Sequence, residues 1–152
     1  MTSLRARDLM SHPPITVPTD ANLEMAARAM LDRAVGCLPV VDTDGRLVGI
    51  VTESDFTAKR GRVPFSTFEA PKLFGEWLGS AAVEKLYHVA RTHAVTTIMS
   101  QPVHTVGEDD GLEQVLELML KHRIKHIVVL REGRPVGVLA RHDMLRLLRD
   151  RL

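Results

Sequence analysis

The stretch "GIVTESDF" (residues 49–56) returns later in the chain as "GVLARHDM" (residues 137–144). Each reads glycine, two apolar residues, three variable positions and then aspartate. The copies differ at the fourth position, where the first has Thr52 and the second has Ala140. A phrase that occurs twice points to an internal duplication, which must then extend into the flanking sequence.

The flanking sequence repeats as well, at one constant offset. A single residue drops out in a turn, after which Gly49 and Asp55 match Gly137 and Asp143. A constant offset with one gap in a loop is typical of two copies of one folding unit. The earlier matching pairs are Met10 and Met99, Ser11 and Ser100, Pro13 and Pro102, Thr16 and Thr105, Val17 and Val106, Asp20 and Asp109, Leu23 and Leu112, and Met30 and Met119.

Each copy is predicted to form a β-α-β-β-α unit. Short β-branched segments at residues 15–17 and 104–106 favour strands. Apolar residues then recur at helical spacing, which predicts a helix with one buried face in each copy. Asp20 or Asn22 is placed to cap the first helix. The apolar positions are Leu23, Ala26, Ala27, Met30, Leu31 and Ala34, and then Leu112, Val115, Leu116, Met119 and Leu120.

Two more strands and a second helix complete each copy. "CLPVV" and "RLVGIV" are predicted strands joined by "DTDG", whose Asp-Gly pair favours a hairpin. Their counterparts are "HIVVL" and "RPVGVL". A helix follows each aspartate, and Leu145, Leu148 and Leu152 mark its apolar face in the second copy. One copy cannot bury both faces of its sheet, so we expect an α/β (α+β) fold in which two copies pack about a pseudo-two-fold axis.

The composition is that of an ordinary globular protein. Of the 152 residues, 45% are hydrophobic and 26% are charged. The net charge of +1 gives no overall electrostatic case for nucleic acid. The single cysteine, Cys37, excludes an internal disulfide and suits a reducing compartment. No signal-peptide core and no apolar run of ~18 residues is present, so we expect a cytoplasmic protein without a membrane partner.

Three longer fragments carry a resemblance to a known family. They are "DLMSHPPITV" and "LPVVDTDGRLVGIVTESD" in the first copy, and "HIVVLREGRPVGVLARHD" in the second. The chain resembles a tandem pair of cystathionine β-synthase (CBS) domains, also called a Bateman module, in a stand-alone CBS domain-containing protein. The resemblance implies repeat 1 at residues 1–60, a helical aromatic-rich insertion at 61–95 and repeat 2 at 96–152.

Thr52 and Asp55 admit two interpretations. Thr-x-x-Asp is nearly a capping box, with Thr52 as the cap and Asp55 in the first turn of the helix. A carboxylate at the end of a strand can also accept two hydrogen bonds from the 2′- and 3′-hydroxyls of a ribose. The resemblance implies this second role, because similar modules use Ser/Thr-x-x-Asp to hold the ribose and phosphate of adenosine nucleotides. Both interpretations can hold at once.

The second copy separates the two interpretations. Ala140 has no hydroxyl and cannot cap, yet Asp143 is retained. If this aspartate were only the partner of a cap, there would be less reason to keep it. We therefore expect one good site in the first copy and a weaker or empty one in the second.

The resemblance also implies an apolar slot for the base and basic residues for the phosphates. Lys125 and His126 enter a strand of the second copy where the first copy has Gly36 and Cys37, so we expect phosphates to be approached from the second copy. Taken singly, each apolar slot residue is better explained as part of the core. The slot residues are Ile15, Thr16, Val17, Cys37, Leu38 and Pro39 in the first copy, and His104, Thr105, Val106, Ile127 and Val128 in the second.

Neither a metal site nor a catalytic site stands out. His122 and His126 have the spacing of two ligands on one helix face, but the helical pattern stops between them and no Cys or acidic partner completes a set. His88 and His93 are poorly spaced for a shared ion. Nucleophile-elbow and phosphate-loop motifs are missing from the sequence. Cys37 begins a buried-looking strand, where a thiol is typically inert.

The insertion differs from a flexible linker, which would be poor in aromatic residues. "PKLFGEWL" and "SAAVEKLYHVARTH" predict a short and a longer amphipathic helix, the second capped by Ser80. These helices either cover edges of the module or form a dimer contact or a lid, and the resemblance implies a homodimer. Five of the six aromatic residues lie here: Phe65, Phe68, Phe74, Trp77 and Tyr87.

We expect a regulatory sensor rather than an enzyme. It would bind AMP, ADP or ATP between its repeats, require no cofactor and signal to an effector protein. Three alternatives stay open: a structural dimerisation module with empty sites, a sensor of S-adenosylmethionine, and a nucleic-acid-binding protein. The last would use a basic strip from Lys121 to His126 together with Arg141 and Arg146.

Overall fold

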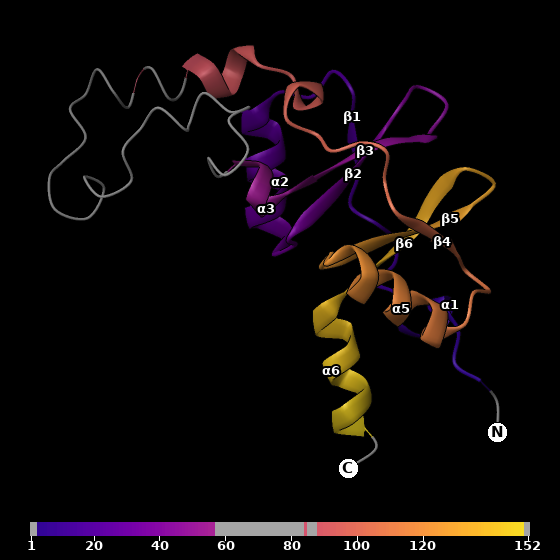
Figure 1. Cartoon of the computed structure of the whole chain (residues 1–152). Helices are drawn as coiled ribbons and strands as arrows, with labels where there is room; N and C mark the ends of the chain where they lie inside the picture. The colour runs from indigo at the N-terminus through magenta and orange to yellow at the C-terminus, as the bar shows by residue number, and fades with distance from the viewer. Residues whose placement is uncertain (1–2, 57–83, 85–87, 151–152) are drawn as a thin grey trace, which may run out of the picture. The chain divides into compact units, whose positions relative to one another are not determined.

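The computed structural model describes residues 3–56, 84 and 88–150 (Figure 1). Both copies form the expected β-α-β-β-α unit, which confirms the mixed α+β fold. A short helix precedes each copy: α1 (Ala6–Leu9) and the 3-10 helix η4 (Val95–Thr97). The first copy contains β1 (Val17–Pro18), α2 (Leu23–Arg33), β2 (Cys37–Val41), β3 (Leu47–Thr52) and α3 (Glu53–Phe56). The second contains β4 (Thr105–Gly107), α5 (Leu112–His122), β5 (His126–Arg131), β6 (Arg134–Ala140) and α6 (Arg141–Asp150).

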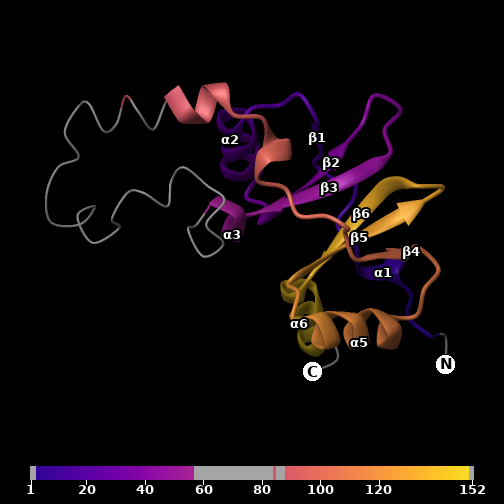
Figure 2. The ribbon, with the colours of Figure 1, turned by 45° about the horizontal axis from the view of Figure 1, so that its top comes forward.

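Each copy builds its own three-stranded sheet, in the orders β1-β2-β3 and β4-β5-β6. In the second sheet β4 is parallel to β5, and β5 is antiparallel to β6. The parallel pair needs a crossover connection, which α5 supplies, whereas a short turn suffices between β5 and β6. In Figures 1 and 2, α5 runs beside this sheet and α6 leaves the end of β6 next to it.

Helices α2 and α5 end alike but begin differently. The side chain of Asn22, one of the two predicted caps, accepts a 2.8 Å hydrogen bond from the N–H of Met25. Gly111 begins α5 without a side-chain cap. Both helices stop at a residue in the left-handed region, Ala34 (φ 51°) and Arg123 (φ 53°), because this conformation turns the chain out of the helix.

The chain divides into two compact units that do not coincide with the two copies. Unit 1 combines Met1–Pro14 and Val41–Val48 with Pro102–Leu152, and unit 2 combines Ile15–Val40 with Gly49–Gln101. The segment before the first copy therefore packs with the second copy, and the segment before the second copy packs with the first.

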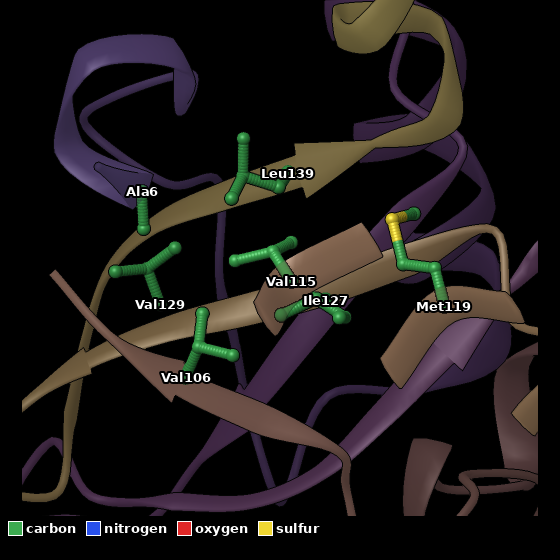
Figure 3. Close-up of a cluster of buried hydrophobic side chains, with 7 residues drawn as sticks. All are labelled: Ala6, Val106, Val115, Met119, Ile127, Val129 and Leu139. Carbon is green, nitrogen blue, oxygen red and sulfur yellow. The ribbon is translucent and has the colours of Figure 1, made fainter. Parts of the chain in front are cut away.

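In unit 1 the opening segment completes the core of the second copy. Ala6 is fully buried, and its N–H donates to the carbonyl of Asp110 over 2.9 Å. Ser11 and Val138 pair through two backbone hydrogen bonds of 2.9 and 3.1 Å. Figure 3 shows Ala6 beside side chains of α5 and of all three strands. The buried cluster contains Ala6, Val106, Val115, Met119, Ile127, Val129 and Leu139.

The corresponding segment docks in the same way in unit 2. Val95, which matches Ala6, is fully buried and donates its N–H to the carbonyl of Ala21 over 2.8 Å. Ser100, which matches Ser11, pairs with Ile50 through backbone hydrogen bonds of 2.8 and 3.1 Å. Both opening segments thus follow one docking pattern.

Each docked segment places a methionine against a glycine of the sheet. A Cβ on Gly137 would lie 2.7 Å from Cγ of Met10 and closer still to its Sδ. A Cβ on Gly49 would lie 3.0 Å from Cγ of Met99 and again closer to its Sδ. The repeated glycine of the two opening stretches is therefore required for this close approach.

Three leucines that were expected on buried helix faces are exposed. Leu31 on α2 and Leu120 on α5, at matching positions, expose 81% and 76% of their surface, and Leu145 on α6 exposes 58%. On each helix the buried face includes fewer positions than the apolar residues of the sequence predict, because only the positions that face the sheet are covered. The side chain of Leu148 and the whole of Leu152 lie outside the described residues.

The aromatic residues of the insertion also lie outside the described part of the chain. Residues 88–92 are helical, as predicted for the end of the second insertion helix. None of the helices in the described ranges is long and apolar enough to cross a membrane.

Candidate functional site

Asp55 lies in the first turn of α3, directly after β3, and is 7% exposed. Its Oδ2 accepts a 2.8 Å hydrogen bond from the N–H of Thr52. This contact is the carboxylate half of a capping box, in which a side chain in the first turn satisfies the N–H at the helix start. The helix begins at Glu53, before the aspartate rather than after it.

Two hydroxyl groups also donate hydrogen bonds to the carboxylate of Asp55. Thr52 Oγ1 donates to Oδ2 over 3.2 Å and also lies 2.8 Å from Ser54 Oγ. Ser100 Oγ donates to Oδ1 over 3.2 Å. Within the described ranges the hydrogen-bond donors to this buried carboxylate are all neutral groups.

Sequence reasoning did not identify Ser100 as a site residue. It reaches Asp55 from the segment before the second copy, 45 residues away. A signal was nevertheless present, because Ser11 and Ser100 occupy matching positions in the two copies. A polar residue that recurs at the same position of both copies is a candidate for a shared contact, and both serines pair with the third strand of a sheet through their backbone.

Asp143 occupies the equivalent place in α6 and is 4% exposed. Its Oδ2 accepts a 2.7 Å hydrogen bond from the N–H of Ala140. Its Oδ1 lies 3.7 Å from Nη1 of Arg146, which is beyond hydrogen-bonding distance but within that of an ion pair. The guanidinium is more than half exposed, so water screens this pair.

The contact with Ala140 corrects one sequence inference. Asp143 was expected to have little structural reason to persist once the hydroxyl was gone. It accepts the backbone N–H of residue 140, and that bond does not depend on the side chain at that position. The helix start alone therefore suffices to explain why Asp143 is retained, so its retention does not decide between the two interpretations.

The predicted residues of the first copy all belong to unit 2. Val17, Cys37, Leu38 and Pro39 are buried, Ile15 is half-buried and Thr16 is exposed. Burial raises the pKa of the Cys37 thiol to about 12. The thiol therefore stays protonated at neutral pH and is a poor nucleophile.

The predicted residues of the second copy all belong to unit 1. Thr105 lies opposite Val128 in the parallel pair of β4 and β5. The carbonyl of Lys125 accepts a 2.9 Å hydrogen bond from the N–H of Arg141, so the start of β5 lies against the start of α6. Lys125 and His126 are thereby brought to the end of the sheet that carries Asp143. His104 is exposed, whereas Val106, Ile127 and Val128 are buried.

His104 stacks on His122. Their ring centroids are 4.0 Å apart and the planes differ by 25°. Desolvation, followed by repulsion from His104 and Lys121, lowers the pKa of His122 below its ordinary value. No cluster of three or more His, Cys, Asp or Glu side chains suited to a metal ion occurs in the described ranges.

Comparison with known proteins places these features in context. A model of the CBS domain matches residues 6–60 and 95–150. A CBS domain-containing protein of Dictyostelium discoideum is 31% identical over 93% of this chain and 89% of its own length. Chloroplastic CBSX1 of Arabidopsis thaliana is 27% identical over 87% of this chain and 57% of its own length.

Two solved structures are similar across nearly the whole chain. The CBS domain of a CBS domain-containing membrane protein from Sphaerobacter thermophilus has 38% identity and a TM-score of 0.80, over 95% of this chain and 88% of that one. The CBS domain pair of protein MJ0100, solved with 5′-methylthioadenosine and S-adenosyl-L-methionine, has 25% identity and a TM-score of 0.69. That similarity covers 95% of this chain and 99% of the other.

Proposed function

The chain belongs to the CBS domain family, and from this premise we propose that it is a regulatory module that binds an adenosine-containing nucleotide: AMP, ADP or ATP. One observation carries the proposal. Each copy holds a buried aspartate at the junction of a strand and a helix, fixed by the N–H three residues earlier. A carboxylate held in this way presents its remaining acceptor positions in a defined direction, which suits the two hydroxyls of a ribose.

The surroundings of the aspartates support a nucleoside rather than a peptide or a metal ion. The first strand and the second strand of each copy bring apolar side chains to the sheet whose third strand leads into the helix that carries the aspartate, which suits a flat base. In the second copy, Lys125 and His126 lie at the end of the sheet that carries Asp143. These basic groups suit the phosphates of a nucleotide.

S-adenosylmethionine is the second candidate. The CBS pair of MJ0100 was solved with this compound and with 5′-methylthioadenosine, and both carry the same ribose without a phosphate chain. A ligand of this kind would use the aspartate but would offer no phosphates to Lys125 and His126.

The proposed role is non-catalytic and dimeric. The buried thiol of Cys37 is protonated, and each of the two aspartates accepts the N–H at a helix start. Ligand binding changes a shape equilibrium only through different affinities for the two shapes. The signal would pass through a homodimer or an effector protein, and a monomer in light scattering at micromolar concentration would contradict the dimer.

The test is thermal unfolding of the ligand-free protein with AMP, ADP, ATP and S-adenosylmethionine. Ligand at about one hundred times its Kd adds about 2.7 kcal/mol, which raises Tm by about 5–11 °C for a chain of this size. The matched control is the Asp55→Ala, Asp143→Ala double variant, compared with its own ligand-free Tm. A rise with one ligand that the double variant loses would support the proposal. If nucleotide-free protein shows no rise with any of them, a structural dimerisation module is favoured instead.

A further inference from the structure

The two aspartates differ in how many acceptor positions they have left. An ionised carboxylate offers about four lone-pair positions. From the described part of the chain Asp55 receives three hydrogen bonds, from the N–H and Oγ1 of Thr52 and from Oγ of Ser100. Roughly one position therefore remains on this carboxylate.

Asp143 receives one hydrogen bond, from the N–H of Ala140, among the described residues. Ala140 has no hydroxyl to donate. Ser11, which matches Ser100, is exposed and pairs with Val138 through its backbone. About three positions therefore remain on Asp143. The exposed guanidinium of Arg146 lies near Oδ1 at 3.7 Å without donating a hydrogen bond.

A ribose diol donates two hydrogen bonds to one carboxylate. At Asp55 it has to displace a hydroxyl of Thr52 or Ser100, so part of the binding free energy is cancelled by the bond that is lost. At Asp143 it displaces no hydrogen bond, because Arg146 has only to move within solvent. The exposed fractions of the two aspartates, 7% and 4%, are nearly equal, so acceptor capacity distinguishes them rather than access.

We propose that Asp143 in the second repeat binds the 2′,3′-diol of a ribonucleoside more tightly than Asp55 does. Ala140 makes this possible because it has no hydroxyl that would occupy an acceptor position of the carboxylate. This inference rests on the proposed function and reverses the sequence expectation that the first repeat holds the good site. The basic residues Lys125 and His126 belong to the same repeat, so the diol and any anionic group of the ligand are held by one unit.

The deciding experiment exchanges the residue that differs between the copies. Adenosine binding is measured by calorimetry on wild type, Ala140→Thr and Thr52→Ala, with 2′,3′-dideoxyadenosine as the ligand that lacks the diol. Ala140→Thr should weaken the tighter adenosine site about fivefold, the equivalent of one neutral hydrogen bond. Thr52→Ala should tighten the weaker site by a similar factor. Affinity for dideoxyadenosine should change in neither variant.

Asparagine variants assign each binding event to a residue. Asp143→Asn keeps an acceptor for the N–H of Ala140 but loses the charge, and should weaken the tighter site about tenfold or more. Asp55→Asn should weaken only the adenosine site of lower affinity, which lies in the first repeat. Circular dichroism and Tm of each variant establish that it is folded.

Two outcomes would overturn the assignment while leaving the proposed function intact. One is tighter adenosine binding by Ala140→Thr, as the Ser/Thr-x-x-Asp pattern would imply. The other is loss of the tighter site in Asp55→Asn but not in Asp143→Asn. If folded wild-type protein binds none of adenosine, AMP, ADP, ATP and S-adenosylmethionine, the proposed function fails and the assignment fails with it.

Discussion

Asp55 and Asp143 make the same backbone contact in two different settings. Each accepts the N–H three residues earlier, at 2.8 and 2.7 Å. Around Asp55 two hydroxyls complete the coordination, whereas Asp143 faces the exposed guanidinium of Arg146. The feature that both copies share is therefore the hydrogen bond at the helix start. The residues that occupy the other acceptor positions of the carboxylate differ between the copies.

The largest effect is expected where each copy packs a methionine on a glycine. Gly137→Ala places a Cβ against Met10, and Gly49→Ala places one against Met99. Overpacking of this kind costs about 1–3 kcal/mol. The loss in free energy of unfolding should be larger for Gly137→Ala than for Gly49→Ala. The added Cβ would lie 3.0 Å from Cβ of Met10 at residue 137 and 3.3 Å from Cβ of Met99 at residue 49. Urea unfolding of both variants gives the two free energies.

The collision itself is tested in a Met10→Ala background. There the Gly137→Ala substitution should cost less, because Cγ and Sδ of the methionine, the two atoms that would lie nearest to the added Cβ, are gone. An equal cost in both backgrounds would show that the loss comes from the strand backbone and not from the packed methionine.

The serines that precede the two copies should differ in their effect on stability. Ser100→Ala removes a donor from a buried carboxylate and should lower the free energy of unfolding by about 1–2 kcal/mol. Ser11→Ala, at the matching exposed position, should change it by less than about 0.5 kcal/mol. Denaturant midpoints of the pair provide the measurement, and similar losses in both would contradict the asymmetry.

A smaller effect is expected from pH at His122 in the second copy. The pKa of His122 is lower in the folded protein than its ordinary value of 6.5, so folding disfavours its protonation. This contribution to stability is present above pH 6.5 and is lost as the pH falls through the folded pKa. The effect stays small because both rings are exposed.

NMR titration of the His122 ring tests this prediction. The first copy has Ile15 and Arg33 at the matching positions, so His104→Ile is the natural control. It should raise the pKa of His122 toward 6.5, since one source of repulsion is removed. An ordinary pKa in the wild-type protein would refute the prediction.

The smallest effect is expected for Arg146→Met. The pair with Asp143 is exposed on the arginine side and spans one helical turn, so its loss should cost about 0.3 kcal/mol. Salt screens such a pair, and the difference from wild type should vanish in high salt. A larger loss that persists in high salt would mean that Arg146 holds Asp143 in place.

Much of the fold could be predicted because the two copies support each other. Strand β2 has the predicted bounds, and most other strands differ by one residue. The exchange of opening segments could not be predicted, since Met10 and Met99 sit in similar local sequences. Such sequences do not specify which sheet each segment joins. Leu31 was assigned to a buried face because helical spacing alone does not show how wide a stripe the sheet covers.

The candidate site was predicted only in part. Asp55 and Asp143 follow from the repeated phrase, and the sequence also shows that Thr52 and Ala140 differ. Ser100 and the stack of His104 on His122 depend on tertiary contacts between distant segments, which periodicity does not report. Their roles became visible only when the partners of each polar atom were known.

The docking of the opening segment onto the second copy determines when the protein can fold during synthesis. Arg5 pairs with Asp109, 104 residues later. At the usual speed of translation, the segment around Ala6 waits about 5–20 s for its partner to be made. During that time its apolar side chains are available to chaperones. A chain split within the insertion would separate each opening segment from the sheet it completes, so the two half-molecules would reach the native structure only by associating with each other.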